Sequence, residues 1–244
     1  MAGTAFFRFQ STLNDFLDST SRNCIINYSF RDHPTVKDAI EALGVPHPEV
    51  NQIIVNGKTV DFAYKLLPGD EIEVYPIHEK STIDLNANLI PEPETPHRFM
   101  LDVHLGKLGR LLRMLGFDTT YDPELTEKEV ATIAARENRI LLSRGVGILK
   151  LKMINYGYWL RSQQPDEQLL EVIRYYKLAP EFKLFSRCMV CNGEIREVDK
   201  EKVQDQLPPK TRLYFQQFYQ CNHCLRVYWK GSHYERMQAF IRQL

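Results

Sequence analysis

The chain has 244 residues and a mass of 28.6 kDa, which allows one or two domains. Hydrophobic residues make up 43% and charged residues 25%, close to the globular average, which excludes a wholly disordered, collagen-like or coiled-coil chain. No apolar run approaches the roughly 18–20 residues that span a bilayer, and the first ten residues do not resemble a secretory signal, so we expect a cytoplasmic protein with no membrane partner.

The net charge of zero is divided unevenly along the chain. Residues 1–95 contain 7 Lys and Arg against 14 Asp and Glu, whereas residues 96–244 contain 24 against 17. A basic C-terminal part can attract a polyanion such as RNA, and an acidic N-terminal part would repel it or compete with it for the basic part. The alternative, two ordinary solvated surfaces, stays open.

Residues 1–79 have the order of elements of a β-grasp domain. We expect a helix over residues 35–43, with a capping box formed by Thr35 and Asp38. Strands are predicted over residues 6–9, 24–30, 53–55 and 71–75. The order of these elements, and the segments Val55-Asn56-Gly57-Lys58 and Leu67-Pro68-Gly69-Asp70-Glu71-Ile72, resemble ubiquitin and the small sulfur-carrier proteins.

Carrier chemistry is not expected of this domain. The resemblance implies a C-terminal Gly-Gly tail, whereas this chain continues through Pro76-Ile77-His78 without one. We therefore expect the domain to bind a protein partner or to act as a lid. Cys24, on an apolar strand, is expected to be a packed core thiol. Residues 80–97 contain three prolines and are predicted to be a linker.

Residues 98–182 alternate between strand and helix patterns. Strands are expected over residues 98–103, 117–121, 139–143 and 153–160, and helices over residues 105–115, 126–136 and 165–176. Such alternation is typical of a parallel sheet with helices on both faces, an α/β domain whose ligands bind at the carboxyl ends of the strands.

Three acids of this region are candidate ligands for a catalytic Mg²⁺ or Mn²⁺. Carboxylates suit these hard cations, which position water and stabilise charge during phosphodiester hydrolysis. Asp102 fits best, because an acid in an apolar strand is costly unless a cation or donors balance it, and a helix cap is its alternative role. Asp122 can instead form a turn before Pro123, and Glu129 can instead cap a helix with Thr126.

The strongest motif is a pair of CxxC knuckles, formed by Cys188 with Cys191 and by Cys221 with Cys224. Four thiolates in this pattern are typical of one tetrahedral zinc ion, and the ion is structural because no coordination position stays open. The spacer between the knuckles exceeds the common length, so we expect an insertion. Strands are predicted over residues 194–198 and 225–228, which gives a zinc ribbon within residues 183–244.

Basic side chains near these motifs are candidate RNA contacts. Those flanking the candidate acids are Lys107, Arg110, Arg113 and Arg144. In the ribbon region, cations alternate with Tyr214, Phe215, Tyr228, Trp229 and Tyr234, and aromatic faces can stack unpaired bases while cations hold phosphates. Alternatively, Tyr214, Phe215 and Phe218 form the small core of the ribbon.

Four segments resemble the Mut-seven C-terminal RNase family, a branch of the PIN-like nucleases. They are residues 99–119, which read FMLDVHLGKLGRLLRMLGFDT, residues 138–144, which read NRILLSR, and the ribbon segments at residues 186–193 and 227–234. Some members carry a fused ubiquitin-like domain. The resemblance implies an α+β β-grasp domain followed by a PIN-like α/β domain with a zinc ribbon, and a metal-dependent ribonuclease. RNA is the expected partner, with tRNA and ribosomal RNA as candidates, and the sequence leaves the substrate open.

One catalytic position departs from the family pattern. The first acid carries over to Asp102 and a helix acid to Glu129, but the family's Thr-Arg-Asp reads Ser143-Arg144-Gly145 here. Glycine supplies no ligand, and a tenfold rate loss needs only about 1.4 kcal/mol. The chain is therefore expected to be a weak nuclease or an inactive adaptor that binds RNA or a ribonucleoprotein. Asp166 or Glu167 is a candidate for partial compensation.

Overall fold

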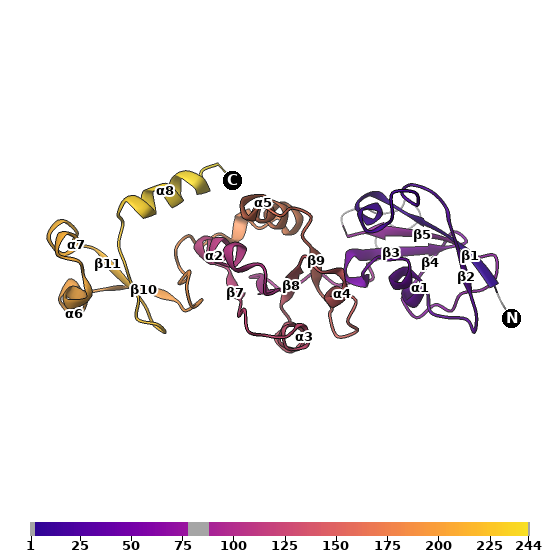
Figure 1. The fold of residues 1–244 in the computed structure, drawn as a ribbon, viewed down its shortest axis with the longest axis horizontal. Helices are drawn as coiled ribbons and strands as arrows, with labels where there is room; N and C mark the ends of the chain where they lie inside the picture. The colour runs from indigo at the N-terminus through magenta and orange to yellow at the C-terminus, as the bar shows by residue number, and fades with distance from the viewer. Residues whose placement is uncertain (1–2, 78–87, 244) are drawn as a thin grey trace. The chain divides into compact units, whose positions relative to one another are not determined.

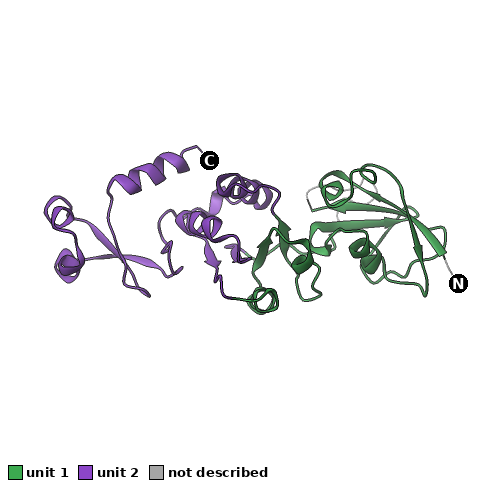
Figure 2. Cartoon of the chain, in the orientation of Figure 1, with its two compact units in different colours: residues 1–94, 125–159 green, residues 95–124, 160–244 purple. Residues whose placement is uncertain are grey.

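The computed structural model describes residues 3–77 and 88–243 (Figure 1). They fall into two compact units, residues 1–94 with 125–159 and residues 95–124 with 160–244 (Figure 2), and each unit is described by itself. Part of the predicted linker, residues 80–87, lies outside the described residues. None of the helices in the described ranges is both long and apolar enough to cross a membrane.

The first unit contains the predicted β-grasp domain. Its mixed five-stranded sheet has the order β2-β1-β5-β3-β4, in which β1 and β5 run parallel and the other neighbours antiparallel. The strands are β1 (Gly3–Phe9), β2 (Ile26–Phe30), β3 (Val50–Val55), β4 (Lys58–Val60) and β5 (Glu71–Pro76). Helix α1 (Val36–Ala42) and the short helices η1 (Ser11–Phe16) and η2 (His47–Glu49) complete the domain. The β-grasp prediction is confirmed.

Alternation along β1 builds the core of this domain. Ala5, Phe7 and Phe9 point inward and are at most 2% exposed, and they pack with Ile40 of α1 and Ile53 of β3. Burying such side chains contributes about 1.5–3 kcal/mol each.

Two local predictions for this domain have opposite outcomes. The capping box at α1 is present, with the Asp38 N–H donating to Thr35 Oγ1 at 3.1 Å and the Thr35 N–H donating to Asp38 Oδ2 at 3.1 Å. The prediction that Cys24 is a core thiol is wrong, because β2 begins only at Ile26 and Cys24 is exposed before it.

The same unit contains part of the predicted α/β domain, residues 125–159. Helix α3 (Glu127–Arg136) leads to β8 (Ile140–Ser143), and the short helix α4 (Val146–Leu149) leads to β9 (Gly157–Trp159). Strands β8 and β9 run parallel, as the strand–helix alternation predicts, with Leu141 beside Gly157 and Ser143 beside Trp159.

Buried polar groups attach the β-grasp domain to this segment. Glu49 is 1% exposed, and its Oε1 accepts the backbone N–H of Trp159 at 2.7 Å. His47 Nε2 lies 2.8 Å from the carbonyl oxygen of Ile154, and the rings of Phe16 and Trp159 have centroids 5.0 Å apart. Residues 125–159 therefore share a packed interior with the β-grasp domain.

The second unit begins with β6 (Arg98–Leu101), α2 (Gly106–Leu115) and β7 (Asp118–Thr120), and it also contains α5 (Pro165–Tyr176). Strands β6 and β7 run parallel. Leu108, Leu112 and Leu115 bury one face of α2. The helix ends at Gly116, whose φ of +100° is left-handed and whose position leaves no room for a Cβ, since it would lie 2.3 Å from the carbonyl oxygen of Lys183.

The ribbon forms a separate small sheet with the order β10-β11-β12, all antiparallel. Its strands are β10 (Ile195–Val198), β11 (Phe218–Cys221) and β12 (Val227–Tyr228), and α8 (Ser232–Ile241) follows them. Helices α6 (Lys200–Val203) and α7 (Pro209–Tyr214) fill the long spacer between the knuckles. The core consists of Val203, Leu207 and Phe218 with Phe215 packed on it, whereas Tyr214 is 74% exposed.

Candidate functional site

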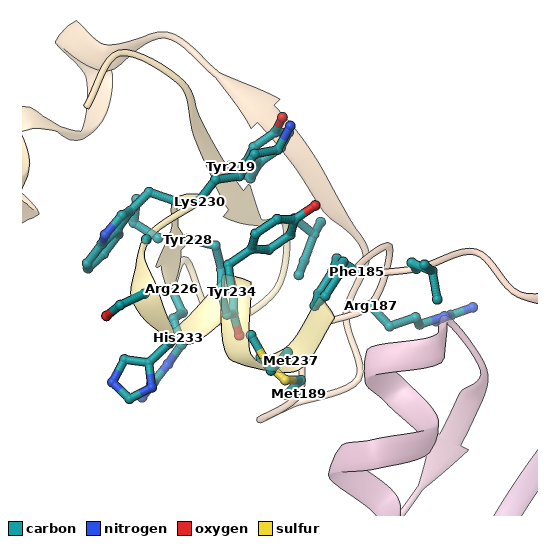
Figure 3. A pocket seen from close by; sticks show the side chains of 16 residues that line it. Phe185, Arg187, Met189, Tyr219, Arg226, Tyr228, Lys230, His233, Tyr234 and Met237 are labelled. Carbon is teal, nitrogen blue, oxygen red and sulfur yellow. The ribbon is translucent and has the colours of Figure 1, made fainter. Parts of the chain in front are cut away.

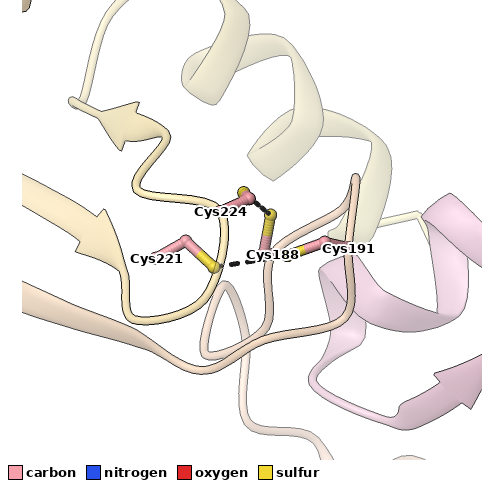
Figure 4. A group of neighbouring side chains, drawn as sticks. All are labelled: Cys188, Cys191, Cys221 and Cys224. Carbon is pink, nitrogen blue, oxygen red and sulfur yellow. Dashed lines mark hydrogen bonds between the residues drawn. The ribbon is translucent and has the colours of Figure 1, made fainter.

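The four knuckle cysteines come together at one point of the second unit (Figure 4). Their sulfur atoms all lie within 4.8 Å of one another, with Cys188 and Cys224 at 3.6 Å and Cys191 and Cys221 at 3.4 Å. A tetrahedral ion with Zn–S bonds of 2.3 Å requires S–S distances of about 3.8 Å. The set fits one structural zinc ion. It is the one group of three or more Cys, His, Asp or Glu in the described ranges that can hold a metal.

Groups around the cysteines hold the knuckles in shape. The Tyr228 hydroxyl lies 3.0 Å from Cys188 Sγ, and the backbone N–H of His223 donates to Cys221 Sγ at 3.4 Å. A Cβ on Gly193 would lie 2.8 Å from Cys221 Sγ, so this position requires glycine. Such outer contacts orient thiolates toward a metal.

Arg113 connects α2 with the first knuckle and is only 5% exposed. Its Nε donates to the carbonyl oxygen of Thr119 at 2.9 Å, and Nη1 donates to the carbonyl oxygens of Val190 at 2.9 Å and Met189 at 3.3 Å. The planar guanidinium matches this set of acceptors. Because the Arg113 guanidinium is buried and donates to backbone carbonyl oxygens, its geometry disfavours the predicted contact with an RNA phosphate.

Asn192 makes a second connection to the same knuckle. Its side-chain oxygen accepts the backbone N–H of Thr119 at 3.0 Å, and its amide donates to Asp118 Oδ1 at 2.7 Å. Together with Arg113, this contact fixes the ribbon's first knuckle to β7.

Asp102 directly follows β6 and is half-buried. The N-cap of α2 is Leu105, and no side chain caps that helix. The backbone carbonyl of Asp102, not its carboxylate, accepts the Leu105 N–H at 3.0 Å. The alternative role of helix cap therefore does not apply to Asp102, and its carboxylate stands at the end of a buried strand.

Asp122 and Glu129 are exposed and have local structural roles. Asp122 Oδ1 accepts the backbone N–H of Glu124 at 3.0 Å, which forms a turn. Glu129 Oε2 accepts the backbone N–H of Thr126 at 2.8 Å and its hydroxyl at 2.7 Å, which completes the capping box of α3. These two hydrogen bonds hold the pKa of Glu129 below its ordinary value.

The turn after β8 has room for the acid that the family pattern expects. Gly145 is exposed with a φ of −95°, which any residue adopts, and a Cβ there would meet only Ser143 Oγ, at 3.6 Å. The Ser143 hydroxyl accepts the Gly145 N–H at 2.8 Å. Arg144 is exposed, and its carbonyl oxygen accepts the indole N–H of Trp159 at 3.0 Å.

The remaining predicted residues lie on helices of the second unit. Lys107 and Arg110 are exposed on α2. Asp166 and Glu167 occupy the first turn of α5, where the Glu167 carboxylate accepts a hydrogen bond from the Ser162 hydroxyl. Acids in the first turn favour the helix through its dipole.

Two family models match the chain in the order that the structure shows. The Mut7-C ubiquitin model matches residues 2–82, and the Mut7-C RNAse domain model matches residues 97–241. No curated protein and no solved structure gives a significant match. The ribbon with its four cysteines and the parallel strand pairs lie within the second match. Since the RNAse domain match covers more than half of the 244-residue chain, the chain belongs to the Mut7-C RNAse domain family.

Proposed function

We propose that the protein hydrolyses RNA phosphodiesters with a divalent cation and an incomplete set of acids. The observation that carries the proposal is Asp102, an acid at the end of a buried strand of the matched RNAse domain that does not cap the following helix. A ligand at this end of a parallel strand is typical of α/β domains.

Asp102 and Glu129 are the proposed protein ligands of Mg²⁺ or Mn²⁺. Carboxylate oxygens are the donors that these ions prefer, and Mg²⁺ commonly takes one or two carboxylates and completes its shell with water and phosphate oxygens. A cation held there would supply Lewis-acid stabilisation of the developing phosphate charge.

Exposed cations are proposed to bind the RNA backbone. Lys107 and Arg110 stand on α2, and Arg144 stands beside Gly145. Such contacts add affinity without reading sequence, and they weaken as salt rises. RNA is the proposed nucleic-acid partner, and we propose a protein partner recruited by the β-grasp domain.

Gly145 favours a second candidate function, an adaptor that binds RNA or a ribonucleoprotein without cleaving it. The family pattern has an acid where Gly145 stands, and glycine cannot ligate an ion or position water. Under this alternative, the cations retain RNA affinity while turnover is absent.

The test compares wild type with Asp102→Asn on single-stranded and structured RNA, with Mn²⁺ or without added metal. Asp205→Asn, an exposed acid in the ribbon, is the matched control. We expect slow, Mn²⁺-dependent cleavage by wild type and by the control, and loss of at least about tenfold in Asp102→Asn, equivalent to about 1.4 kcal/mol. Equal cleavage by all three proteins would remove Asp102 from the site. RNA binding without cleavage by any of them would favour the adaptor.

A further inference from the structure

A pocket of about 640 Å³ lies in the ribbon, and none of the residues proposed for hydrolysis lines it (Figure 3). Its walls come from five parts of the second unit: residues between 184 and 189 at the start of the first knuckle, Ile195 of β10, Tyr219 of β11, residues 226–231 after the second knuckle, and the first turns of α8. The volume falls in the range of about 300–1,000 Å³ that is typical of small-molecule sites.

The lining combines aromatic rings with positive charge. Arg187, Arg226 and Lys230 supply cations, and no Asp or Glu lines the pocket. The aromatic side chains are Phe185, Tyr219, Tyr228, Trp229 and Tyr234. A wall of this kind favours a flat, apolar group that carries negative charge nearby, and it disfavours a cationic ligand.

The three cations are not equivalent. Arg187 donates to the carbonyl oxygen of Asn192 at 3.1 Å and lies 3.8 Å from Asp118, so it is committed to the knuckle. Arg226 and Lys230 are exposed, and their side chains donate no hydrogen bond to any part of the chain that the structure describes. Lys230 Nζ lies 5.8 Å from the centroid of the Tyr219 ring. These two cations remain available to an anionic ligand.

Contacts with neighbouring residues fix the aromatic rings of the pocket near the N-terminus of α8. Tyr234 packs against Phe185 with ring centroids 4.6 Å apart, and its hydroxyl accepts the Gln238 amide at 2.8 Å. The Tyr228 hydroxyl contacts Cys188 of the metal site at 3.0 Å. The pocket is therefore built on the zinc knuckle, and α8 closes one side of it.

We propose that this pocket binds one unpaired nucleotide of single-stranded RNA, with the base against the aromatic side chains and a phosphate at Arg226 and Lys230. The inference rests on the proposed RNA-directed function and adds a second RNA contact to it. In a double helix the faces of each base are covered by the neighbouring base pairs and cannot stack on a protein side chain. The pocket therefore selects single-stranded RNA. Stacking on aromatic side chains tolerates any base, so we expect little sequence preference.

The experiment measures the affinity of the full chain, in the Asp102→Asn background, for a short fluorescein-labelled oligouridylate by fluorescence anisotropy with Mg²⁺ present. Tyr234→Ala and Arg226→Gln test the pocket, and Tyr234→Phe keeps the ring. The exposed α7 residues supply matched controls outside the pocket, Tyr214→Ala and Arg212→Gln. Zinc content and thermal unfolding confirm that each variant is folded.

We expect Tyr234→Ala to weaken binding about 5- to 100-fold, the range of one lost base stack, and Tyr234→Phe to bind as the parent does. Arg226→Gln should weaken binding and reduce its salt dependence. An abasic oligonucleotide of the same length and an RNA duplex should bind the parent and Tyr234→Ala equally.

Two results overturn the inference in distinguishable ways. If the parent binds the oligouridylate and the pocket variants match the α7 controls, the pocket assignment fails and the proposed function stands. If the parent binds no RNA at all, the proposed function fails and the pocket assignment fails with it. Equal losses on the abasic and the natural strand also contradict a base in the pocket.

Discussion

Arg113 shows how far a single residue's role can be inferred from its neighbours in sequence. It stands in a helix with Lys107 and Arg110, and the leucine periodicity alone places all three cations off the apolar face. The structure buries Arg113 because its acceptors, the carbonyls of Thr119, Met189 and Val190, come from β7 and from a knuckle far along the chain. The sequence pattern around Arg113 cannot predict hydrogen-bond partners that lie so far along the chain.

Replacing Arg113 should therefore loosen the ribbon. Arg113→Met leaves buried carbonyl oxygens without a donor, at a cost of about 1–3 kcal/mol in the free energy of unfolding. Arg113→Lys keeps the charge but loses the planar fork, so it should rescue only part of that loss. Arg110→Met, on the exposed side of the same helix, is the control. The measurement is chemical unfolding, and an Arg113→Met variant as stable as Arg110→Met would refute the role.

Sequence rules predicted hydrogen bonds correctly where both partners lie within one turn of the same helix. The capping boxes of Thr35 with Asp38 and of Thr126 with Glu129 are both formed. The predicted metal-ligand role of Glu129 is a different matter, because it depends on residues distant in sequence and stays a proposal. Its cap does not exclude that role, since both hydrogen bonds from Thr126 are accepted by Oε2, one of the two carboxylate oxygens of Glu129.

At the scale of elements, long periodic segments were predicted well and short ones were not. The helix at residues 165–176 is α5 with the same bounds, and each predicted strand overlaps an observed one. Strand β11 and helices α6, α7 and α8 were not predicted. The ribbon's small elements surround a four-cysteine cluster and a core of three buried residues, and neither feature gives a strong periodic pattern in the sequence. Gly231-Ser232-His233 resembles a turn, yet Ser232 begins α8.

The contact between η2 and β9 joins two elements that the sequence assigns to different domains. Glu49 accepts the backbone N–H of Trp159 from a position that is 1% exposed. Glu49→Ala should leave that buried N–H without an acceptor and cost about 1–3 kcal/mol of stability. Glu71→Ala, at an exposed site of β5, should change little. Thermal unfolding compares the two, and equal midpoints would show that the contact contributes nothing.

At the scale of the whole molecule, the structure divides the chain differently from a string of separate domains. Residues 125–159 share a compact unit with the β-grasp domain, through buried contacts of His47 and Glu49. Domains are predicted from the order of elements and the composition of the sequence. Neither property reveals isolated polar contacts such as those of His47 and Glu49. The β-grasp domain is thus a structural support of the nuclease region as well as a candidate recruiting surface.

Metal removal should affect the parts of the molecule unequally. A zinc chelator should unfold the ribbon, because the metal–thiolate bonds that join the two knuckles are lost, while the β-grasp core contains no cysteine ligand. Hydrogen exchange followed by mass spectrometry should show faster exchange over residues 186–241 and unchanged exchange over β1, β3 and β5. Readdition of zinc should restore protection. Uniform loss of protection, or none, would contradict a structural metal confined to the ribbon.

We propose that glycine at position 145 limits the rate of RNA hydrolysis by this protein. The most direct measurement is the initial rate of single-stranded RNA cleavage with Mn²⁺ by wild type, Gly145→Asp and Gly147→Asp. Both positions have room for a side chain, so Gly147→Asp adds the same charge two residues away. We predict that Gly145→Asp raises the rate at least about tenfold, that Asp102→Asn abolishes the gain, and that Gly147→Asp matches wild type. A Gly145→Asp rate no higher than that of Gly147→Asp would contradict the account.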